Sequence, residues 1–246
     1  MKKIIRFGRD TKMADVIHSD YTLIPIITRF GIGFGFGDDT VETVCEAHAV
    51  NADFFLEIIR AFHDPYYKKD SEIEKFPPAV IIDYLLKSHR YYTDIKLREL
   101  DRRLEELSWK EETAKNNRRV LNNFFQEYKH EVLVHTQHEE DVVYPYILEV
   151  EQAFKLNAVS EELLSKIREY PIDSYVEEHS SLDSALLDLK NLLIKFLPSP
   201  DDQYAVNELL REVFSFEKDL QDHAELEEQF LVPRVKIMET KLLNKQ

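Results

Sequence analysis

A pattern of histidine, paired glutamates and proline occurs twice in this 246-residue chain. The first copy begins at His135, the second begins at His223, and both read His-x3-Glu-Glu-x4-Pro. Residues four apart in sequence lie on one face of an α-helix, about one turn from each other. Each copy therefore predicts a helix that directs an imidazole and a carboxylate, that of Glu139 or Glu227, toward one point.

A single histidine precedes each copy by a similar distance. His89 lies 46 residues before His135, and His179 lies 44 residues before His223. A constant internal offset is the signature of a repeated unit, here a helix with one histidine, a turn, and a helix with His-x3-Glu. Two such helical hairpins predict an all-α fold that contains an antiparallel four-helix bundle.

The two units together supply four histidines and two glutamates, a set typical of a dinuclear metal centre inside a bundle. Imidazole and carboxylate ligands without thiolate favour two iron ions, with manganese as the next choice. If both glutamates and one oxo or hydroxo group bridge the metals, each metal keeps an open octahedral position. An open position on a redox-active metal predicts binding of NO, O2 or peroxide. The predicted ligands are His89, His135, Glu139, His179, His223 and Glu227.

Several polar residues near these ligands have two interpretations. His138 lies close to the helix face of His135, which makes it a candidate hydrogen-bond partner of the ligands. Glu140 and Glu228 point about 100° away from the predicted ligands that precede them, toward solvent or toward a second layer of the site. Aromatic residues at helical spacing are more typical of an ordinary core, but four tyrosines are also candidates for lining the site: Tyr84, Tyr91, Tyr92 and Tyr144.

Composition narrows the class of protein. The formal net charge of −15 argues against nucleic acid and anionic membranes as partners, because both repel an acidic surface. Cys45 is the only cysteine, which excludes an intramolecular disulfide and any all-thiolate metal site within one chain. Apolar runs such as 79–82 are far too short to span a bilayer, and the N-terminus lacks a signal-peptide stretch. We expect a cytoplasmic protein.

The glycines divide the chain into two parts. Four of the five lie between Gly31 and Gly37, the fifth is Gly8, and the rest of the chain has none. We predict a small helical N-terminal domain over residues 1–66, with the glycines in a turn between short helices. The segment before this glycine loop has helical rather than strand patterning, so the Gly-x-Gly-x-Gly sequence does not meet the structural context of a dinucleotide site. Thr40 and Asn51 are predicted N-caps of the helices that follow the loop.

A polar segment from His63 to Phe76 predicts a linker, and the bundle is predicted over residues 77–246. Its helices are expected to begin near Pro78, Thr113, Asp173 and Asp202, with Asp173 as an N-cap. Prolines ten residues after the motif histidines are expected to kink the second and fourth helices at matching heights.

The motifs Ser88-His89-Arg90, His135-x3-Glu139-Glu140, Glu178-His179 and His223-x3-Glu227-Glu228 resemble those of hemerythrin-like (HHE) cation-binding domains. Within that group the chain resembles the repair-of-iron-centres family, because Ile24–Gly37 and Thr40–Cys45 are similar to that family's N-terminal domain. The resemblance covers nearly the whole chain. It implies a cytoplasmic non-haem di-iron protein that repairs iron–sulfur clusters damaged by nitric oxide or peroxide, with nitric oxide reduction as a further activity.

The chain departs from that family in one respect. Gly33–Asp38 stands where the family has Asp-Phe-Cys-Cys-Gly-Gly, so this variant N-terminal domain lacks the vicinal cysteine pair. Roles that rest on those thiols are therefore not carried over to this chain. The alternatives are an O2 or NO sensor or carrier without turnover, an iron donor, and a helical interaction protein whose His/Glu pairs are incidental. Iron–sulfur proteins and a second copy of the chain are the macromolecular partners considered.

Overall fold

The computed structural model describes residues 7–63, 75–109, 114–178 and 180–244. The prediction of an all-α protein is confirmed, because the described residues form helices and turns with one isolated bridge, Lys12–Thr40, and no strand. The chain divides into two compact units, 1–87 and 88–246. The domain boundary predicted within the linker stays a prediction, because most of that linker lies outside the described residues.

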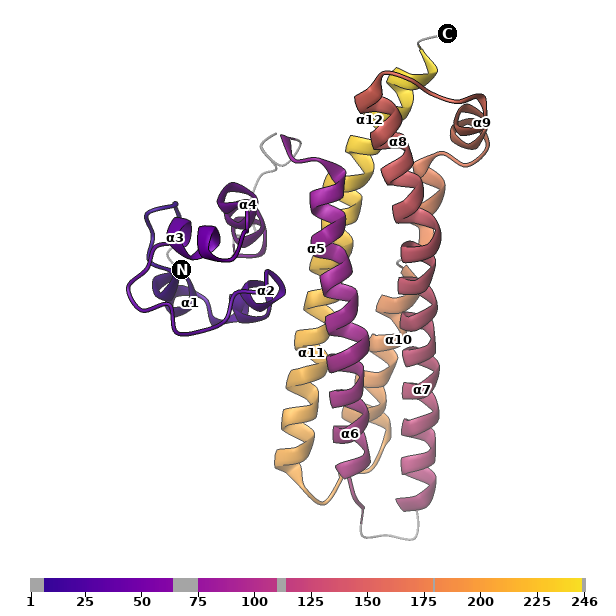
Figure 1. Cartoon of the computed structure of the whole chain (residues 1–246). Coiled ribbons are helices and arrows are strands. Elements are labelled where there is room, and N and C mark those ends of the chain that lie inside the picture. Colours follow the sequence, from indigo (N-terminus) through magenta and orange to yellow (C-terminus); the bar gives the residue numbers. More distant parts are fainter. Residues whose placement is uncertain (1–6, 64–74, 110–113, 179, 245–246) are drawn as a thin grey trace. The chain divides into compact units, whose positions relative to one another are not determined.

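The first unit consists of short helices around a buried aromatic and aliphatic core (Figure 1). Thr40 accepts a hydrogen bond from the Thr43 amide, and Asn51 accepts one from the Phe54 amide, so both predicted N-caps are confirmed. The loop between α2 and α3 contains Gly31, Gly35 and Gly37 at positive φ, which glycine adopts without steric cost. The helices are α1 Met13–Ser19, η1 Tyr21–Leu23, α2 Ile24–Arg29, α3 Val41–Ala47 and α4 Ala52–His63.

The second unit is a bundle of long helical rods (Figure 1). The contacts close a ring in which α6 packs on α7, α7 on α10, α10 on α11 and α11 on α6. Among the described residues, a π-helical turn interrupts three of the rods, and a fourth π turn, η6, ends the rod that contains α10. The first rod consists of α5 Pro78–Tyr91, which begins in the first unit, η3 Tyr92–Lys96 and α6 Leu97–Glu106. The second consists of α7 Ala114–His138, η4 Glu139–Val143 and α8 Tyr144–Leu156, and the short helix α9 Glu161–Glu169 follows it. The third consists of η5 Ile172–Glu178, α10 Ser180–Asn191 and η6 Leu192–Phe196, and the fourth of α11 Gln203–Leu226, η7 Glu227–Leu231 and α12 Val232–Leu243.

Two details between the second and third rods differ from expectation. The predicted N-cap Asp173 is wrong: it lies inside the 3-10 segment η5, and its carboxylate pairs with Lys236 of α12 instead of capping α10. The short helix α9 was not predicted. Its N-cap Ser160 accepts a hydrogen bond from the Leu163 amide, and Leu163 and Leu164 are buried, so local capping and one apolar face are enough to form it.

The bundle core lies in the half of the rods built by α6, α7, α10 and α11. Phe216 and Tyr92 are fully buried and meet edge to face, with ring centroids 5.4 Å apart. Tyr128 packs against Phe216 from α7 at 6.4 Å. These rings and leucines from all four helices form one apolar cluster. The cluster lies near the predicted metal ligands and determines the distance between the helices there.

The two motif prolines closely follow the π turns η4 and η7. Pro145 and Pro233 each occupy the first turn of the helix that resumes after the π turn. Proline has no amide N–H, and its ring clashes with the carbonyl four residues earlier, so an α-helix cannot pass it unchanged. A π turn accommodates the proline by inserting one extra residue. The repeated motif thus corresponds to a repeated helical irregularity at matching positions.

Glu239 of α12 is buried and provides a test of pH dependence. Its Oε1 accepts hydrogen bonds from the Tyr146 hydroxyl and, at 3.0 Å, from the Ile172 amide. Burial raises the pKa of Glu239 above its usual 4.5, against the opposing effect of these two hydrogen bonds. The folded chain therefore holds this proton to higher pH than the unfolded chain does, and the corresponding stability is lost as pH rises through the folded pKa.

We expect Glu239→Gln to remove this pH-dependent loss, because glutamine accepts the same hydrogen bonds without a buried charge. The free energy of unfolding of the variant relative to the parent should increase between pH 4.5 and pH 7.5, as measured by chemical denaturation. Glu131→Gln, at an exposed position, is the matched control and should show no such trend. A difference between Glu239→Gln and the parent that stays constant with pH would contradict the burial argument.

No helix among the described residues combines the length and the apolar character that crossing a bilayer requires.

Candidate metal centre

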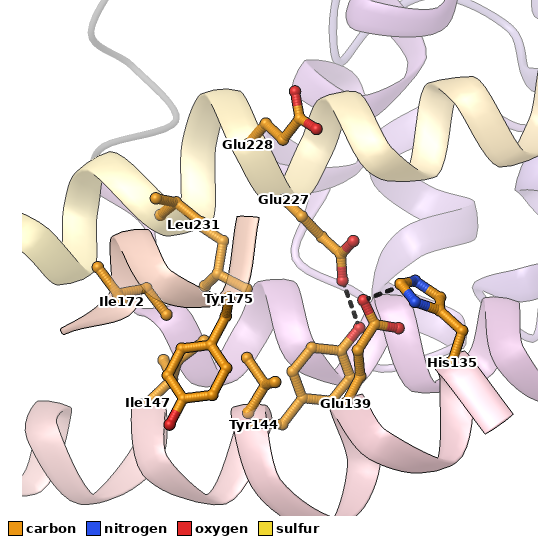
Figure 2. Close-up of a pocket in the computed structure, with 11 residues that line it drawn as sticks. His135, Glu139, Tyr144, Ile147, Ile172, Tyr175, Glu227, Glu228 and Leu231 are labelled. Carbon is orange, nitrogen blue, oxygen red and sulfur yellow. Dashed lines mark hydrogen bonds and ion pairs between the residues drawn. The ribbon is translucent and has the colours of Figure 1, made fainter. Parts of the chain in front are cut away.

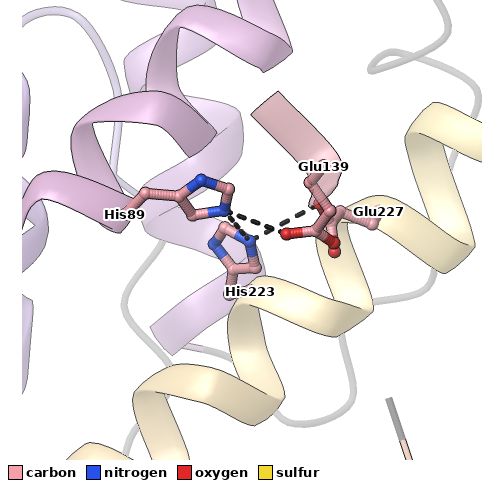
Figure 3. A group of neighbouring side chains, drawn as sticks. All are labelled: His89, Glu139, His223 and Glu227. Carbon is pink, nitrogen blue, oxygen red and sulfur yellow. Dashed lines mark hydrogen bonds and ion pairs between the residues drawn. The ribbon is translucent and has the colours of Figure 1, made fainter. Parts of the chain in front are cut away.

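Four of the six predicted ligands converge inside the bundle from three rods (Figure 3). His89 comes from α5 and His223 from the last turn of α11. Glu139 and Glu227 are the first residues of the π turns η4 and η7. Each π turn inserts one extra residue, which changes the direction in which the side chains beyond the glutamate point. Both carboxylates therefore lie where the regular α-helix ends, just before the motif proline.

The donor atoms of this cluster lie close enough to share metal ions. One ligand atom from each of the four residues lies within 4.8 Å of the others. The Nε2 atoms of His89 and His223 are 3.2 Å apart, and His89 Nε2 is 3.2 Å from Glu139 Oε2. His223 Nε2 is 3.5 Å from Glu227 Oε1. Each of these four residues has about 6 % or less of its surface exposed, so the donors are shielded from bulk water.

The two remaining predicted ligands, His135 and His179, are not part of this four-residue cluster. His135 approaches Glu139 from its own rod, with Nε2 3.2 Å from Oε1, and its side chain is slightly more exposed than the other donors. His179 lies outside the described residues, so its place in the centre stays a prediction. The structure thus brings five of the six predicted side chains to one region, with Glu139 in contact with imidazoles from two rods.

The residues of the cluster fit a bound cation. Two carboxylates are buried among imidazole nitrogens, and burying charge is costly unless a counter-charge or metal compensates it. The donor set contains the nitrogen and oxygen ligands that iron and manganese accept, without thiolate. His223 directs Nε2 toward the other donors, 3.2 Å from His89 Nε2 and 3.5 Å from Glu227 Oε1, so Nε2 is the nitrogen available to a metal.

Glu140 supports His89 from outside the cluster. Its Oε1 lies 2.9 Å from His89 Nδ1, on the side of the ring away from the other donors. A carboxylate on the second ring nitrogen of a metal-binding histidine orients the imidazole and increases its basicity. Burial alone lowers the pKa of His89, but Glu139 and Glu140 outweigh it and raise the pKa to about 9. A metal ion held by His89 would therefore compete with a proton for the ring at neutral pH.

Tyr144 joins the cluster from the start of α8 (Figure 2). Its hydroxyl donates to Glu227 Oε1 at 2.6 Å and lies 3.3 Å from His89 Nε2. The phenol and the His89 ring are stacked, with centroids 5.6 Å apart. Burial, reinforced by the charges of Glu227 and Glu139, raises the pKa of Tyr144 well above its ordinary value. The phenol is therefore neutral when no cation is present.

A small cavity adjoins these donors (Figure 2). Its volume of about 20 Å³ accommodates a water-sized guest or little more. Apolar side chains form much of its wall, so it is suited to a small uncharged ligand rather than to an organic substrate. The lining residues are His135, Glu139, Val143, Tyr144, Ile147, Ile172, Tyr175, Glu227, Glu228, Leu231 and Val232.

The other candidate side chains occupy different places. Tyr84 packs against Phe30 in the core of the first unit. Tyr92 packs edge to face on His223 at 5.6 Å and donates to Asp219, so it supports the rod that carries that ligand. Tyr91 packs against Tyr92.

The remaining polar candidates are also placed. His138 packs against the Tyr175 ring, with centroids 6.4 Å apart, and with His130 it lines a surface groove. Glu228 follows Glu227 on the rim of the cavity (Figure 2). Among the described residues, Glu140 contacts a histidine of the cluster, His89, and Glu228 lines the cavity.

The chain matches one protein-family model, whose description agrees with a cation site of this kind. A family model described as Hemerythrin HHE cation binding domain matches residues 80–235, which is more than half of the chain and includes all six predicted ligands. A search of the curated proteins finds no match.

Proposed function

This chain belongs to the hemerythrin HHE cation-binding family, and from that premise we propose that it is a non-haem di-iron protein that binds and reacts with nitric oxide or dioxygen. The observation that carries the proposal is the buried convergence of His89, His223, Glu139 and Glu227. When bound, the two iron ions supply one-electron redox chemistry and open positions for a small ligand. Iron is preferred to manganese because the imidazole-rich donor set suits it better.

The protein's own residues define what reaches the centre. Glu139 and Glu227 provide the negative charge that holds the cations, and Glu140 orients His89 through Nδ1. Ile147 and Leu231 line the adjoining cavity, limit the water that it can hold and restrict the guest to a small molecule. The Tyr144 hydroxyl provides a hydrogen-bond donor at this wall of the site. A small and largely apolar cavity beside two carboxylates favours a diatomic gas over peroxide or a larger substrate.

The biological role follows from the resemblance of the motifs and of the N-terminal segment to the repair-of-iron-centres family. We propose that the protein acts in the cytoplasm in repairing iron–sulfur clusters damaged by nitrosative or oxidative stress. Damaged iron–sulfur proteins are then its macromolecular partners. The missing cysteine pair means that any electrons or iron passed to a partner leave by a route without thiols at Gly33–Asp38.

The test begins with metal content. After anaerobic loading with ferrous iron and removal of excess metal, we expect two irons per chain and an absorption spectrum that changes on titration with NO. A content well below two irons per chain would overturn the di-iron proposal. Repeated NO consumption with an electron donor indicates turnover, whereas one saturating binding event indicates a sensor or carrier.

The repair role needs a separate assay. An iron–sulfur protein inactivated by NO is incubated with the iron-loaded protein, with its metal-free form, or with the same amount of free ferrous iron. Recovery of cluster absorbance only with the loaded protein supports repair. Equal recovery with free iron contradicts it and leaves the metal centre unaffected.

A further inference from the structure

Tyr144 breaks the symmetry between the two halves of the repeated motif. It follows Glu139 by five residues, and the residue that follows Glu227 by five is Val232. Both residues open the helix that resumes after a π turn. Only the first half therefore carries an oxygen donor at this position. Its hydroxyl crosses to the carboxylate of the other half, Glu227.

The distances around the phenol oxygen match those between neighbouring ligands of one ion. With metal–ligand bonds of about 2.1 Å, two ligands at right angles lie about 3 Å apart. Tyr144 Oη is 2.6 Å from Glu227 Oε1 and 3.3 Å from His89 Nε2. His89 Nε2 is 3.2 Å from His223 Nε2. The phenol oxygen is thus as close to His89 Nε2 as the other donors are to one another, and it is closer still to Glu227 Oε1.

The side chain is also held for this position. Tyr144 is 2 % exposed, and its ring stacks on His89 with an interplanar angle of 18°. Rotation away from the cluster would leave a buried hydroxyl without the carboxylate that accepts its hydrogen bond, which is costly. The phenol is therefore fixed in place before any metal arrives.

We propose that Tyr144 is a metal ligand, whose phenolate oxygen binds the same ion as His89 and His223. This assignment rests on the proposed iron centre. On binding, the bond between Oη and the metal forms, the O–H bond breaks, and the proton is released to solvent, as is general for ligands that bind in their deprotonated form. No electron is transferred in this step. A phenolate is a hard anionic oxygen donor, so it stabilises ferric over ferrous iron and makes the two metal positions unequal.

Ferric loading of the full chain tests the assignment, with ferric ion alone as the probe. We expect the parent protein to show a visible phenolate-to-iron charge-transfer band, with phenolate ring vibrations in the resonance Raman spectrum. Tyr144→Phe, which removes only the hydroxyl, should still bind iron but lose both signals. It should also release ferric ion to a chelator at least about tenfold more readily, since even lost support of a ligand costs that much.

Tyr146→Phe is the matched control. Tyr146 is also buried on α8, but its hydroxyl pairs with Glu239, so this variant should keep the band. Two bound irons without a phenolate signal in the parent would overturn the ligand assignment while the iron centre stands. A signal that persists in Tyr144→Phe would assign it to another tyrosine. Failure of the parent to bind iron would overturn the centre and this assignment together.

Discussion

Replacement of Glu139 and Glu227 together with glutamine is expected to abolish the binding of two irons per chain. Both carboxylates are buried in the cluster, and they supply the negative charge that a divalent or trivalent cation requires. Glutamine keeps the size of the side chain and still accepts the Tyr144 hydrogen bond, so the fold should survive. Loss of a supporting hydrogen bond alone costs about 10–100-fold in metal affinity, and loss of both charged ligands should exceed that range.

Metal content and thermal unfolding measure this effect. A ligand at one hundred times its dissociation constant stabilises the folded state by about 2.7 kcal/mol, so iron should raise the melting temperature of the parent but not of the variant. Asp141→Asn with Glu225→Gln is the matched control. These carboxylates lie two residues from the ligands, are exposed, and alter the net charge equally. If the Glu139/Glu227 variant retained two tightly bound irons, the cluster would not be the metal centre.

The second large effect concerns the apolar cluster that spaces the rods. Phe216→Ala should lower the free energy of unfolding by about 3–5 kcal/mol, the usual cost of removing a fully buried aromatic ring. The ring lies between Tyr92 and Tyr128, so its loss leaves a cavity that their rigid side chains fill poorly. Chemical denaturation followed by circular dichroism measures the change.

Phe214 offers a control two residues away on the same helix. It is about half exposed and packs against Lys190, whose Nζ lies 4.8 Å from its ring centroid. Phe214→Ala should cost about 1 kcal/mol or less, the range of a cation–π contact at a partly exposed site. Equal losses for the two variants would mean that the core does not depend on the Phe216 ring.

Helical spacing made much of the bundle and the cluster predictable. His-x3-Glu places both side chains on one face whatever the surroundings, and the observed cluster contains both pairs' carboxylates. The caps Thr40 and Asn51 were predictable for the same reason, because each accepts a hydrogen bond from an amide three residues later. The prediction of Asp173 as a cap was wrong because its partner Lys236 lies 63 residues away, and a local sequence pattern does not predict such a contact.

The roles of Glu140 and Tyr144 were not predictable from their neighbours. On an isolated helix, the Glu140 side chain points away from that of Glu139. In the bundle, this orientation brings Glu140 into contact with His89 of another rod. Tyr144 had the spacing of an ordinary core aromatic. Only one feature of the sequence distinguished Tyr144: the equivalent position in the second copy of the motif is Val232. This difference does not by itself indicate what the tyrosine does.

The sequence by itself determined the all-helical class, the two matching halves and the chemical identity of the donors, because these depend on contacts within one or two turns of helix. Tertiary structure decided how the halves meet. His89 contacts Glu139 and His223, and Tyr144 reaches Glu227, because rods distant in the sequence pack side by side. The π turns at Glu139 and Glu227 depend on both contributions. A proline in the sequence disfavours a regular α-helix at these positions, and the packing of the bundle determines the direction in which the altered helix continues.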